Sequence, residues 1–472
     1  MSDTPAGVSP SDSPVLVCGL GHVGIRVVEL LGRLGERAVV ITQDTRPEWR
    51  RIAEGFGATV VVGDARDPGL LRASGLLEAK ALLAITDRDP VNLEIALDAA
   101  RLRPELPVVA RLFDQNLAYQ LESSHGVRRA LSVSALAAPA FAGAALGESV
   151  LASFTVDGKL DVVIREGDDL VVFEESEARE RLRPKVSALH AEARRPAGAG
   201  LLRVWTSAPL GLRTVFAALV ALTLLSVFLF SWGMDLGLVD AFYFVVTTVT
   251  TVGYGDITPL KASPAMKLYA CVLMILGSAT VATLTSILTA FVVTERFERL
   301  LGRGRVPAGG HVLVVGVGSV GSRTLAALQR AGVPAAGVDV DPGVARSVAA
   351  GTAVVTGDAR LAAVLEQAHV ATARAIVAVT GDDAVNLGVA LLAKKLNPKI
   401  RTVVRLFDAG LAEKVQASLD VDVAMGAARV AAPMFVACAL EDDVAAAVVS
   451  EGALHVLKKS PSGLVWTKRA LT

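Results

Sequence analysis

The stretch Thr250-Thr251-Val252-Gly253-Tyr254-Gly255-Asp256 lies between two long apolar segments and organises the chain around it. Residues 214–234 and 268–294 contain no charged side chain over 21 and 27 positions. A helix of about 20 apolar residues crosses a hydrocarbon core of about 30 Å. The sequence therefore predicts two membrane spans at 212–234 and 266–294, with a short pore helix at 240–250 and an irregular loop at 251–256 between them.

The irregular loop at 251–256 predicts a pore. Non-helical backbone at membrane depth is tolerated only where it is buried in protein or lines a water-filled cavity. Gly253 and Gly255 permit backbone angles that turn successive carbonyl groups toward one axis, and stacked carbonyls can replace the water that K⁺ sheds. The predicted selectivity filter consists of residues 251–256, with K⁺ at Thr251, Val252, Gly253 and Tyr254. Gly255 continues the filter, and Asp256 adds negative charge at the outer mouth. One loop cannot surround an ion, so the pattern predicts four chains around one pore.

Basic residues lie mainly outside the two spans. Arg203 and Arg213 precede the first span, and Arg296, Arg299, Arg303 and Arg305 follow the second, with only Lys261 and Lys267 between them. Such a bias predicts that both termini are cytoplasmic and that the chain is a multi-pass protein of the cell membrane in contact with lipid. Neither span carries regularly spaced arginines, so opening is expected to depend on something other than a voltage-sensing helix.

Composition narrows the possible partners. The 472 residues have a formal net charge of zero and no dense basic tract, which argues against nucleic acid as a partner. The three cysteines (Cys18, Cys271 and Cys438) form no CxxC pair and fit a reducing cytoplasm. Residues 1–14 are expected to be a disordered tail, because they lack the basic and apolar regions of a signal peptide. Residues 183–211 and 295–310 are expected to be linkers.

An internal repeat flanks the pore segment. Gly357-Asp358-Ala359-Arg360 repeats Gly63-Asp64-Ala65-Arg66, and the neighbourhoods of Asn386 and Arg405 repeat those of Asn92 and Arg111 at the same offset of 294 residues. In each copy, short apolar strands alternate with helices, which predicts a parallel, doubly wound Rossmann-like sheet. The predicted domains are 15–182 (sheet 15–130, connecting helix 131–147, small α+β lobe 150–182) and 311–472.

Each copy contains a glycine motif that follows a strand and opens a helix. The motif residues are Gly19, Gly21 and Gly24 in the first copy and Gly316, Gly318 and Gly321 in the second. Glycines here permit a tight turn and close approach of a phosphate to the helix N-terminus. In the second copy, Asp339 or Asp341 could accept hydrogen bonds from ribose. In the first copy Thr42 stands at the position of Asp339 and only Asp44 remains, so its ligand stays open.

Residues 212–294 resemble the two-helix pore module of prokaryotic potassium channels, and both flanking copies resemble the RCK (TrkA-N) domains that regulate potassium conductance. The resemblance implies a homotetramer in which eight domains form a ligand-gated ring. Gly277 resembles the gating-hinge glycine, although close helix packing is an equal alternative. The resemblance further implies that NAD or an adenine nucleotide contacts eight matched positions in addition to the glycine loops: Asp64, Ala65, Thr86, Arg111 and their counterparts Asp358, Ala359, Thr380 and Arg405.

Three alternatives remain to be weighed. Ca²⁺ is a possible further ligand, because Asp382, Asp383 and the acidic stretch 166–177 carry carboxylates. A membrane-anchored dinucleotide-binding oxidoreductase is the alternative function, but no substrate domain or catalytic pair accompanies the glycine motifs, so an enzyme is not expected. A regulatory subunit of a separate transporter is unnecessary, since the chain carries its own filter motif.

Overall fold

The computed structural model describes residues 13–43, 46–113, 115–124, 126–147, 150–156, 159–166, 169–174, 210–300, 305–344, 348, 352–407 and 409–472. These residues belong to two compact units, Arg194–Gly304 and the combination of Met1–Ala193 with Arg305–Thr472. The candidate residue Asp44, nearly all of the expected tail and most of the first expected linker lie outside the described residues.

The first copy forms a six-stranded sheet with the strand order β3-β2-β1-β4-β5-β6, parallel throughout. Its strands are β1 (Val15–Cys18), β2 (Ala38–Thr42), β3 (Thr59–Val62), β4 (Ala81–Ala84), β5 (Val108–Arg111) and β6 (Arg129–Leu131). Its helices are α1 (His22–Arg33), α2 (Pro47–Gly55), α3 (Pro68–Ala73), α4 (Asp89–Leu102) and α5 (Gln115–Ser124). The central strands β1 and β4 are buried at every position, as expected for apolar runs covered on both faces.

The second copy repeats this sheet with the order β12-β11-β10-β13-β14-β15. Its strands are β10 (Val312–Val315), β11 (Ala335–Asp339), β12 (Ala353–Thr356), β13 (Ala375–Ala378), β14 (Arg401–Arg405) and β15 (Val423–Met425). The helical segments are α12 (Ser319–Arg330), α13 (Ala362–Gln367), η3 (Val370–Thr372), α14 (Asp383–Leu396) and α15 (Ala409–Ser418). The order reverses between the first and fourth strands, which is where ligands bind in open α/β sheets. The predicted fold class is confirmed.

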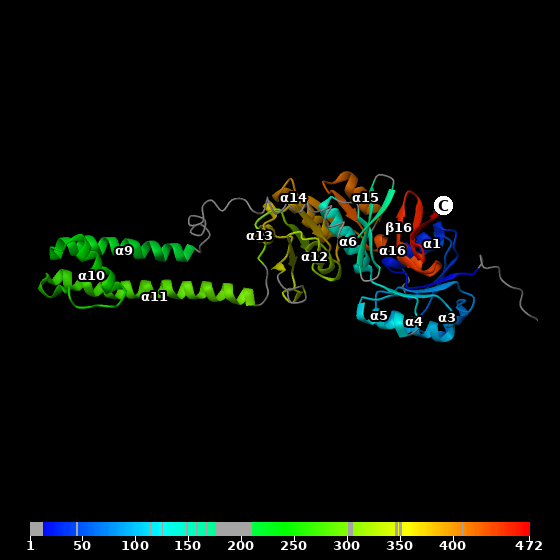
Figure 1. The fold of residues 1–472 in the computed structure, drawn as a ribbon, viewed down its shortest axis with the longest axis horizontal. Helices are drawn as coiled ribbons and strands as arrows, with labels where there is room; N and C mark the ends of the chain where they lie inside the picture. Colours follow the sequence, from blue (N-terminus) through cyan, green and yellow to red (C-terminus); the bar gives the residue numbers. More distant parts are fainter. Residues whose placement is uncertain are drawn as a thin grey trace, which may run out of the picture. The chain divides into compact units, whose positions relative to one another are not determined.

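The two connecting helices are exchanged between the copies. Helix α6 (Val133–Leu146) follows the first sheet but packs on the second, where Phe141 is fully buried beside α12 (Figure 1). Helix α16 (Ala427–Leu440) follows the second sheet but packs on the first, where Phe435 is fully buried beside α1. Each sheet therefore completes its hydrophobic core with a helix from the other copy.

Small antiparallel sheets follow the exchanged helices. The first consists of β7 (Val150–Val156), β8 (Lys159–Glu166) and β9 (Asp169–Glu174), and the second of β16 (Val444–Ser450), β17 (Ala453–Ser460) and β18 (Gly463–Ala470). Strand β16 contacts β7, and Thr472 donates its backbone N–H to the carbonyl of Arg33 at 2.8 Å. These contacts hold the end of the second copy against the first copy.

The middle unit contains the helices α9 (Leu210–Met234), α10 (Leu238–Val249) and α11 (Pro264–Leu300), with the short η1 (Pro259–Lys261) before α11. Segments Arg213–Met234 and Pro264–Ile287 are long and apolar enough to cross a membrane. Phe230 of α9 is fully buried and meets Phe244 of α10 edge-on, with ring centroids 4.9 Å apart. Helix α11 continues past the predicted end of the span at 294, because charged helix-forming residues extend it to Leu300.

Candidate functional site

The loop after α10 has an alternating backbone. Thr251, Gly253 and Gly255 have φ angles of 62°, 55° and 80°, in the left-handed region. Glycine adopts this region readily, but a β-branched threonine does so only under strain. Because the residues between them lie outside this region, successive peptide groups rotate relative to one another as a filter requires. Val252 and Tyr254 are exposed in the single chain.

Helix α10 holds the loop in place. The backbone N–H groups of Val252 and Gly253 both donate to the carbonyl of Thr247, at 2.9 and 3.1 Å. The rings of Tyr243 and Tyr254 lie parallel with centroids 6.5 Å apart. The pore helix thus fixes both the inner and the outer part of the loop.

Gly277 lies where α11 passes α10. A Cβ atom at Gly277 would come within 2.8 Å of Cγ2 of Val249. The glycine therefore has a packing role in this structure, and its predicted role as a gating hinge stays a prediction.

The third glycine of each motif has a structural role. A Cβ atom on Gly24 would overlap the carbonyl oxygen of Gly19, and one on Gly321 would overlap that of Gly316. By contrast, a Cβ atom on Gly21 or Gly318 would meet no described atom within 4 Å. The middle glycine thus leaves open space at the start of α1 and α12, and the N-terminus of a helix is suited to hold an anion through its backbone N–H groups.

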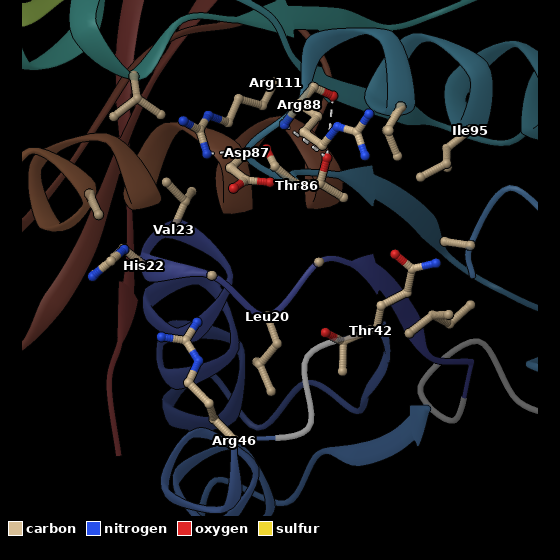
Figure 2. Close-up of a pocket in the computed structure, with 18 of the residues that line it drawn as sticks. Leu20, His22, Val23, Thr42, Arg46, Thr86, Asp87, Arg88, Ile95 and Arg111 are labelled. Atoms are coloured by element: carbon tan, nitrogen blue, oxygen red, sulfur yellow. Dashed lines mark hydrogen bonds between the residues drawn. The ribbon is translucent and has the colours of Figure 1, made fainter. Parts of the chain in front are cut away.

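The first cavity, of 360 Å³, lies over the first sheet (Figure 2). Six of the predicted residues line it, namely Gly19, Gly21, Asp64, Ala65, Thr86 and Arg111. Gly24 does not, in keeping with its packing role. Residues that were not predicted as ligand contacts also line it, including Thr42, Arg46 and Arg88 from the first copy and Phe407 from the second. Arg405, predicted for the site of the second copy, reaches this cavity as well. The exchanged helix brings the second copy to this edge of the first sheet.

The second cavity, of 340 Å³, lies over the second sheet. It is lined by the predicted residues Gly316, Gly318, Asp339, Asp358, Ala359, Thr380 and Arg405. The Asp339 carboxylate accepts from the backbone N–H of Val317 at 2.6 Å and therefore lies against the glycine loop. Asp341 is not among the lining residues, and its carboxylate instead accepts from the N–H of Gly343 at 2.7 Å within a turn.

Asp64 and Asp358 are each paired with the arginine two positions later. Arg66 donates to both oxygens of Asp64, and Arg360 does the same to Asp358, with shortest distances of 2.6 and 2.7 Å. These hydrogen bonds hold the pKa of both carboxyl groups below the usual range. Both aspartates line a cavity, and both also order their own loop.

Two buried asparagines position the predicted threonines. The side-chain oxygen of Asn92 accepts from the N–H of Thr86 at 2.8 Å and from its hydroxyl at 2.7 Å, while its amide donates to the carbonyl of Arg111 at 2.9 Å. Asn386 makes the same contacts to Thr380 and Arg405. The sequence alone assigns these asparagines no role, although both recur in the 294-residue repeat.

Arg405 reaches both cavities. Its guanidinium lies 4.4 Å from the ring centre of Phe407, whose ring in turn lies 4.4 Å from that of His22. Burial lowers the pKa of Arg405, opposed by Asp383 and assisted by the positive charge of Arg111. Its Nε atom is buried and has no hydrogen-bond partner among the described residues. Two like charges at one edge of a cavity favour an anionic ligand there.

The aspartates proposed as calcium ligands accept hydrogen bonds from backbone N–H groups. Asp382 caps α14 by accepting from the N–H of Val385, and Asp383 accepts from the N–H of Phe407. Within the described ranges, no group of three or more His, Cys, Asp or Glu side chains could hold a metal ion. Parts of the acidic stretch 166–177 lie outside those ranges. The calcium prediction therefore has no support here.

Family models match all three segments of the chain. The TrkA-N domain model matches residues 15–133 and 312–427, and the ion channel model matches residues 214–294 between them. Potassium channel protein 1 of Methanocaldococcus jannaschii is 28% identical over 204 residues, which is 42% of this chain and 59% of the relative. Probable potassium channel protein 2 of the same organism is 26% identical over 237 residues, 48% of this chain and 66% of the relative. The matches thus span less than two thirds of these relatives.

A solved structure supports the fold over nearly the whole chain. The structure described as a GsuK channel bound to NAD has a TM-score of 0.52 at 16% identity and covers 92% of this chain and 64% of that one. The matched models define the class: proteins in which TrkA-N domains are joined to an ion channel domain. Within that class, this chain belongs to the ion channels that carry TrkA-N domains, with one TrkA-N domain before the ion channel domain and one after it.

Proposed function

We propose that the protein is a potassium-selective channel of the cell membrane whose opening is controlled by nucleotides, without enzymatic activity. The observation that carries this proposal is the alternating backbone of residues 251–255, held by α10 between two apolar helices. The filter is formed by residues 251–256, with K⁺ at the carbonyls of the first four and the Thr251 hydroxyl. Both termini and both TrkA-N domains are cytoplasmic.

Four chains surround the pore, because one loop supplies only one quarter of a ring of carbonyls. The exposed Val252 and Tyr254 side chains then pack against neighbouring chains, and exposed faces of the spans meet neighbours or lipid. Two TrkA-N domains per chain give eight per tetramer, which assemble as a ring below the pore.

NAD or an adenine nucleotide is the regulatory ligand. The glycine loops, the open space before Gly21 and Gly318, and the lining arginines suit a phosphate-bearing ligand. A structural neighbour was solved with NAD. The ligand controls opening only if its affinity differs between the open and closed arrangements of the ring. Exchange of α6 and α16 between the copies transmits a shift at one cavity directly to the other sheet.

Flux measurements test the pore. We expect purified protein in liposomes to pass K⁺ and exclude Na⁺ down equal gradients. Gly255→Ala should abolish selectivity, because φ at this position is 80° and alanine resists it. Gly237→Ala is the control, since Gly237 has a φ of −58° before α10. Absence of K⁺ flux under every ligand condition would overturn the channel proposal.

Ligand control is tested separately in the same liposomes. NAD⁺, NADH, ATP and ADP are added in turn to wild-type protein and to Gly21→Asp and Gly318→Asp variants. Each variant places a carboxylate where phosphate is expected, and its Cβ atom would meet no described atom within 4 Å. K⁺ flux through the wild-type protein should respond to at least one nucleotide. Flux through a variant that carries both substitutions should respond to none. Selective flux that ignores every nucleotide would leave the pore assignment intact and refute nucleotide control.

A further inference from the structure

The two cavities differ at the edge where a ribose would lie. In the second cavity, β11 ends at Asp339, whose carboxylate can accept from ribose hydroxyls. In the first cavity, β2 ends at the equivalent Thr42, which is buried and carries no charge. In Rossmann-like domains, an acidic residue here selects an unmodified ribose, whereas a nearby arginine accommodates a ribose 2′-phosphate.

Such an arginine follows β2 in the first copy. Arg46 lines the first cavity, four residues beyond Thr42, and its guanidinium stacks on Trp49 at 3.9 Å from the ring centre. Figure 2 shows the guanidinium directed toward the glycine loop near Leu20 and His22, on the opposite side of the loop from Arg88 and Arg111. Burial, and then the positive charge of Arg46, lower the pKa of His22, which keeps this edge free of a second cation at neutral pH.

The complete sets of residues that line the two cavities also differ in charge, and the first cavity is the more positive. Among the described residues, the first cavity is lined by five arginines and two aspartates, and the second by one arginine and two aspartates. One first-cavity arginine, Arg66, is already paired with Asp64. The first lining still carries net positive charge, while the second is net negative. The cationic groups of the first lining also lie on both sides of the glycine loop, so they suit phosphates at two places.

We propose that the first cavity selects an adenine nucleotide that carries a phosphate on its ribose, of the kind found in NADP-type dinucleotides, whereas the second cavity takes the unmodified ribose. Arg46 contacts the ribose phosphate, and Arg111 with Arg405 contacts the other phosphates. The absence of a carboxylate at Thr42 removes the repulsion that Asp339 imposes in the second cavity. This inference rests on the proposed function, in which both cavities bind nucleotides.

Two isomeric probes separate phosphate position from phosphate number. Adenosine 2′,5′-bisphosphate and adenosine 5′-diphosphate each carry two phosphates, but only the former has one on the ribose 2′ position. Their binding to full-length protein in nanodiscs is measured by calorimetry in the Gly318→Asp background, which leaves the first cavity available. The Gly21→Asp background reports the second cavity in the same way.

We expect the first cavity to bind the 2′,5′-bisphosphate at least about tenfold more tightly than the 5′-diphosphate, since a charge-assisted contact to phosphate is among the stronger hydrogen bonds. Arg46→Gln should remove this preference, and Thr42→Asp should reverse it. Arg50→Gln is the matched control, because Arg50 lies on α2, the helix that Arg46 precedes, but pairs with Glu54 and does not line the cavity. The second cavity should prefer the 5′-diphosphate.

Equal affinity for the two isomers in the Gly318→Asp background would overturn the ribose-phosphate inference while leaving nucleotide binding established. A preference that survives Arg46→Gln would equally overturn the role of this arginine. Failure of both isomers, NAD⁺ and NADP⁺ to bind wild-type protein would instead refute the proposed nucleotide function.

Discussion

The first and second TrkA-N copies keep the same internal ties and differ in what faces the ligand. Asn92 and Asn386 make the same set of hydrogen bonds, and Gly24 and Gly321 pack against equivalent carbonyls. At the end of the second strand, however, one copy has Thr42 and the other Asp339. Residues that build the loops have thus been retained in both copies, while residues that choose the ligand have diverged.

The two copies differ in the residues that face the ligand, but each copy depends on the other to complete its hydrophobic core. Each sheet is covered by the connecting helix of the other copy, with Phe141 and Phe435 fully buried in the exchanged positions. Neither copy can complete its core alone in this arrangement. The two sites therefore specialise within one structural unit, which is a physical basis for coupling between them.

The largest effect on stability is expected from a substitution that disrupts the fold of one TrkA-N copy. Gly321→Ala places a Cβ atom against the carbonyl of Gly316 and should cost about 3 kcal/mol or more, as overpacking against rigid backbone does. Because the cores are shared, amide hydrogen exchange should accelerate in β1 and β4 of the first copy as well as in β10 and β13. Gly318→Ala, with open space in front of it, is the control. Faster exchange confined to the second copy would show that the copies unfold independently.

The second-largest effect is expected on nucleotide affinity when Arg405 or Arg111 is substituted. Arg405 lines both cavities and Arg111 only the first. Removing one charge-assisted contact costs about 1.5–3 kcal/mol, or roughly 10- to 150-fold in affinity. Arg405→Gln should therefore weaken ADP binding at both cavities, and Arg111→Gln at the first alone. Calorimetry in the Gly21→Asp and Gly318→Asp backgrounds measures each site. Unchanged affinity at the first cavity in Arg405→Gln would disprove the sharing.

Substitution of the aspartate at the edge of the second cavity should reduce nucleotide affinity by a smaller factor. Asp339→Asn keeps the shape but weakens acceptance from ribose and from the N–H of Val317, so NAD⁺ affinity there should fall about tenfold. Asp341→Asn provides a matched control, because that carboxylate accepts from Gly343 in a turn and does not line the cavity. Equal losses in the two variants would mean that loop order, and not ribose contact, determines the affinity. Calorimetry in the Gly21→Asp background measures both.

The sequence predicts these features to the extent that they are local. Apolar runs such as Val15–Cys18 predict the strands, glycine spacing predicts the loops, and the stretch around Gly253 predicts the filter. Exchange of α6 and α16 is not predictable, because both helices are rich in alanine and carry no pattern that selects one sheet over the other. For the same reason, the approach of Arg405 to the first cavity is hidden: it depends on packing between residues almost 300 positions apart. The roles of Asn92 and Asn386 could have been found from the repeat, since both are polar residues within an apolar helix face.

The smallest effect on stability is expected from removing a charge at the contact between the end of the second copy and the first copy. Glu36 accepts from Lys80 of its own copy at 2.7 Å and from Arg469 of β18 at 2.8 Å. Burial alone would raise the pKa of Glu36, but the two hydrogen bonds outweigh it and leave the pKa below the usual range. Glu36→Gln should lower stability at pH 7 by on the order of 1 kcal/mol, since the partners are partly exposed and screened by solvent.

The pH dependence follows from the sign of that pKa shift. A carboxyl group with a depressed folded-state pKa stabilises the fold above its unfolded-state value of about 4.3, and the stabilisation disappears as the pH falls through the folded-state value. The difference in thermal midpoint between wild type and Glu36→Gln should therefore be full at pH 7 and close toward zero as the solution becomes more acidic. Glu105→Gln is the control, because Glu105 is largely exposed and pairs with Arg103 two residues away in the same copy. A difference that persists unchanged into acid would mean that the Glu36 side chain stabilises the junction through its shape and not through its charge, and the electrostatic tie between the copies would be excluded.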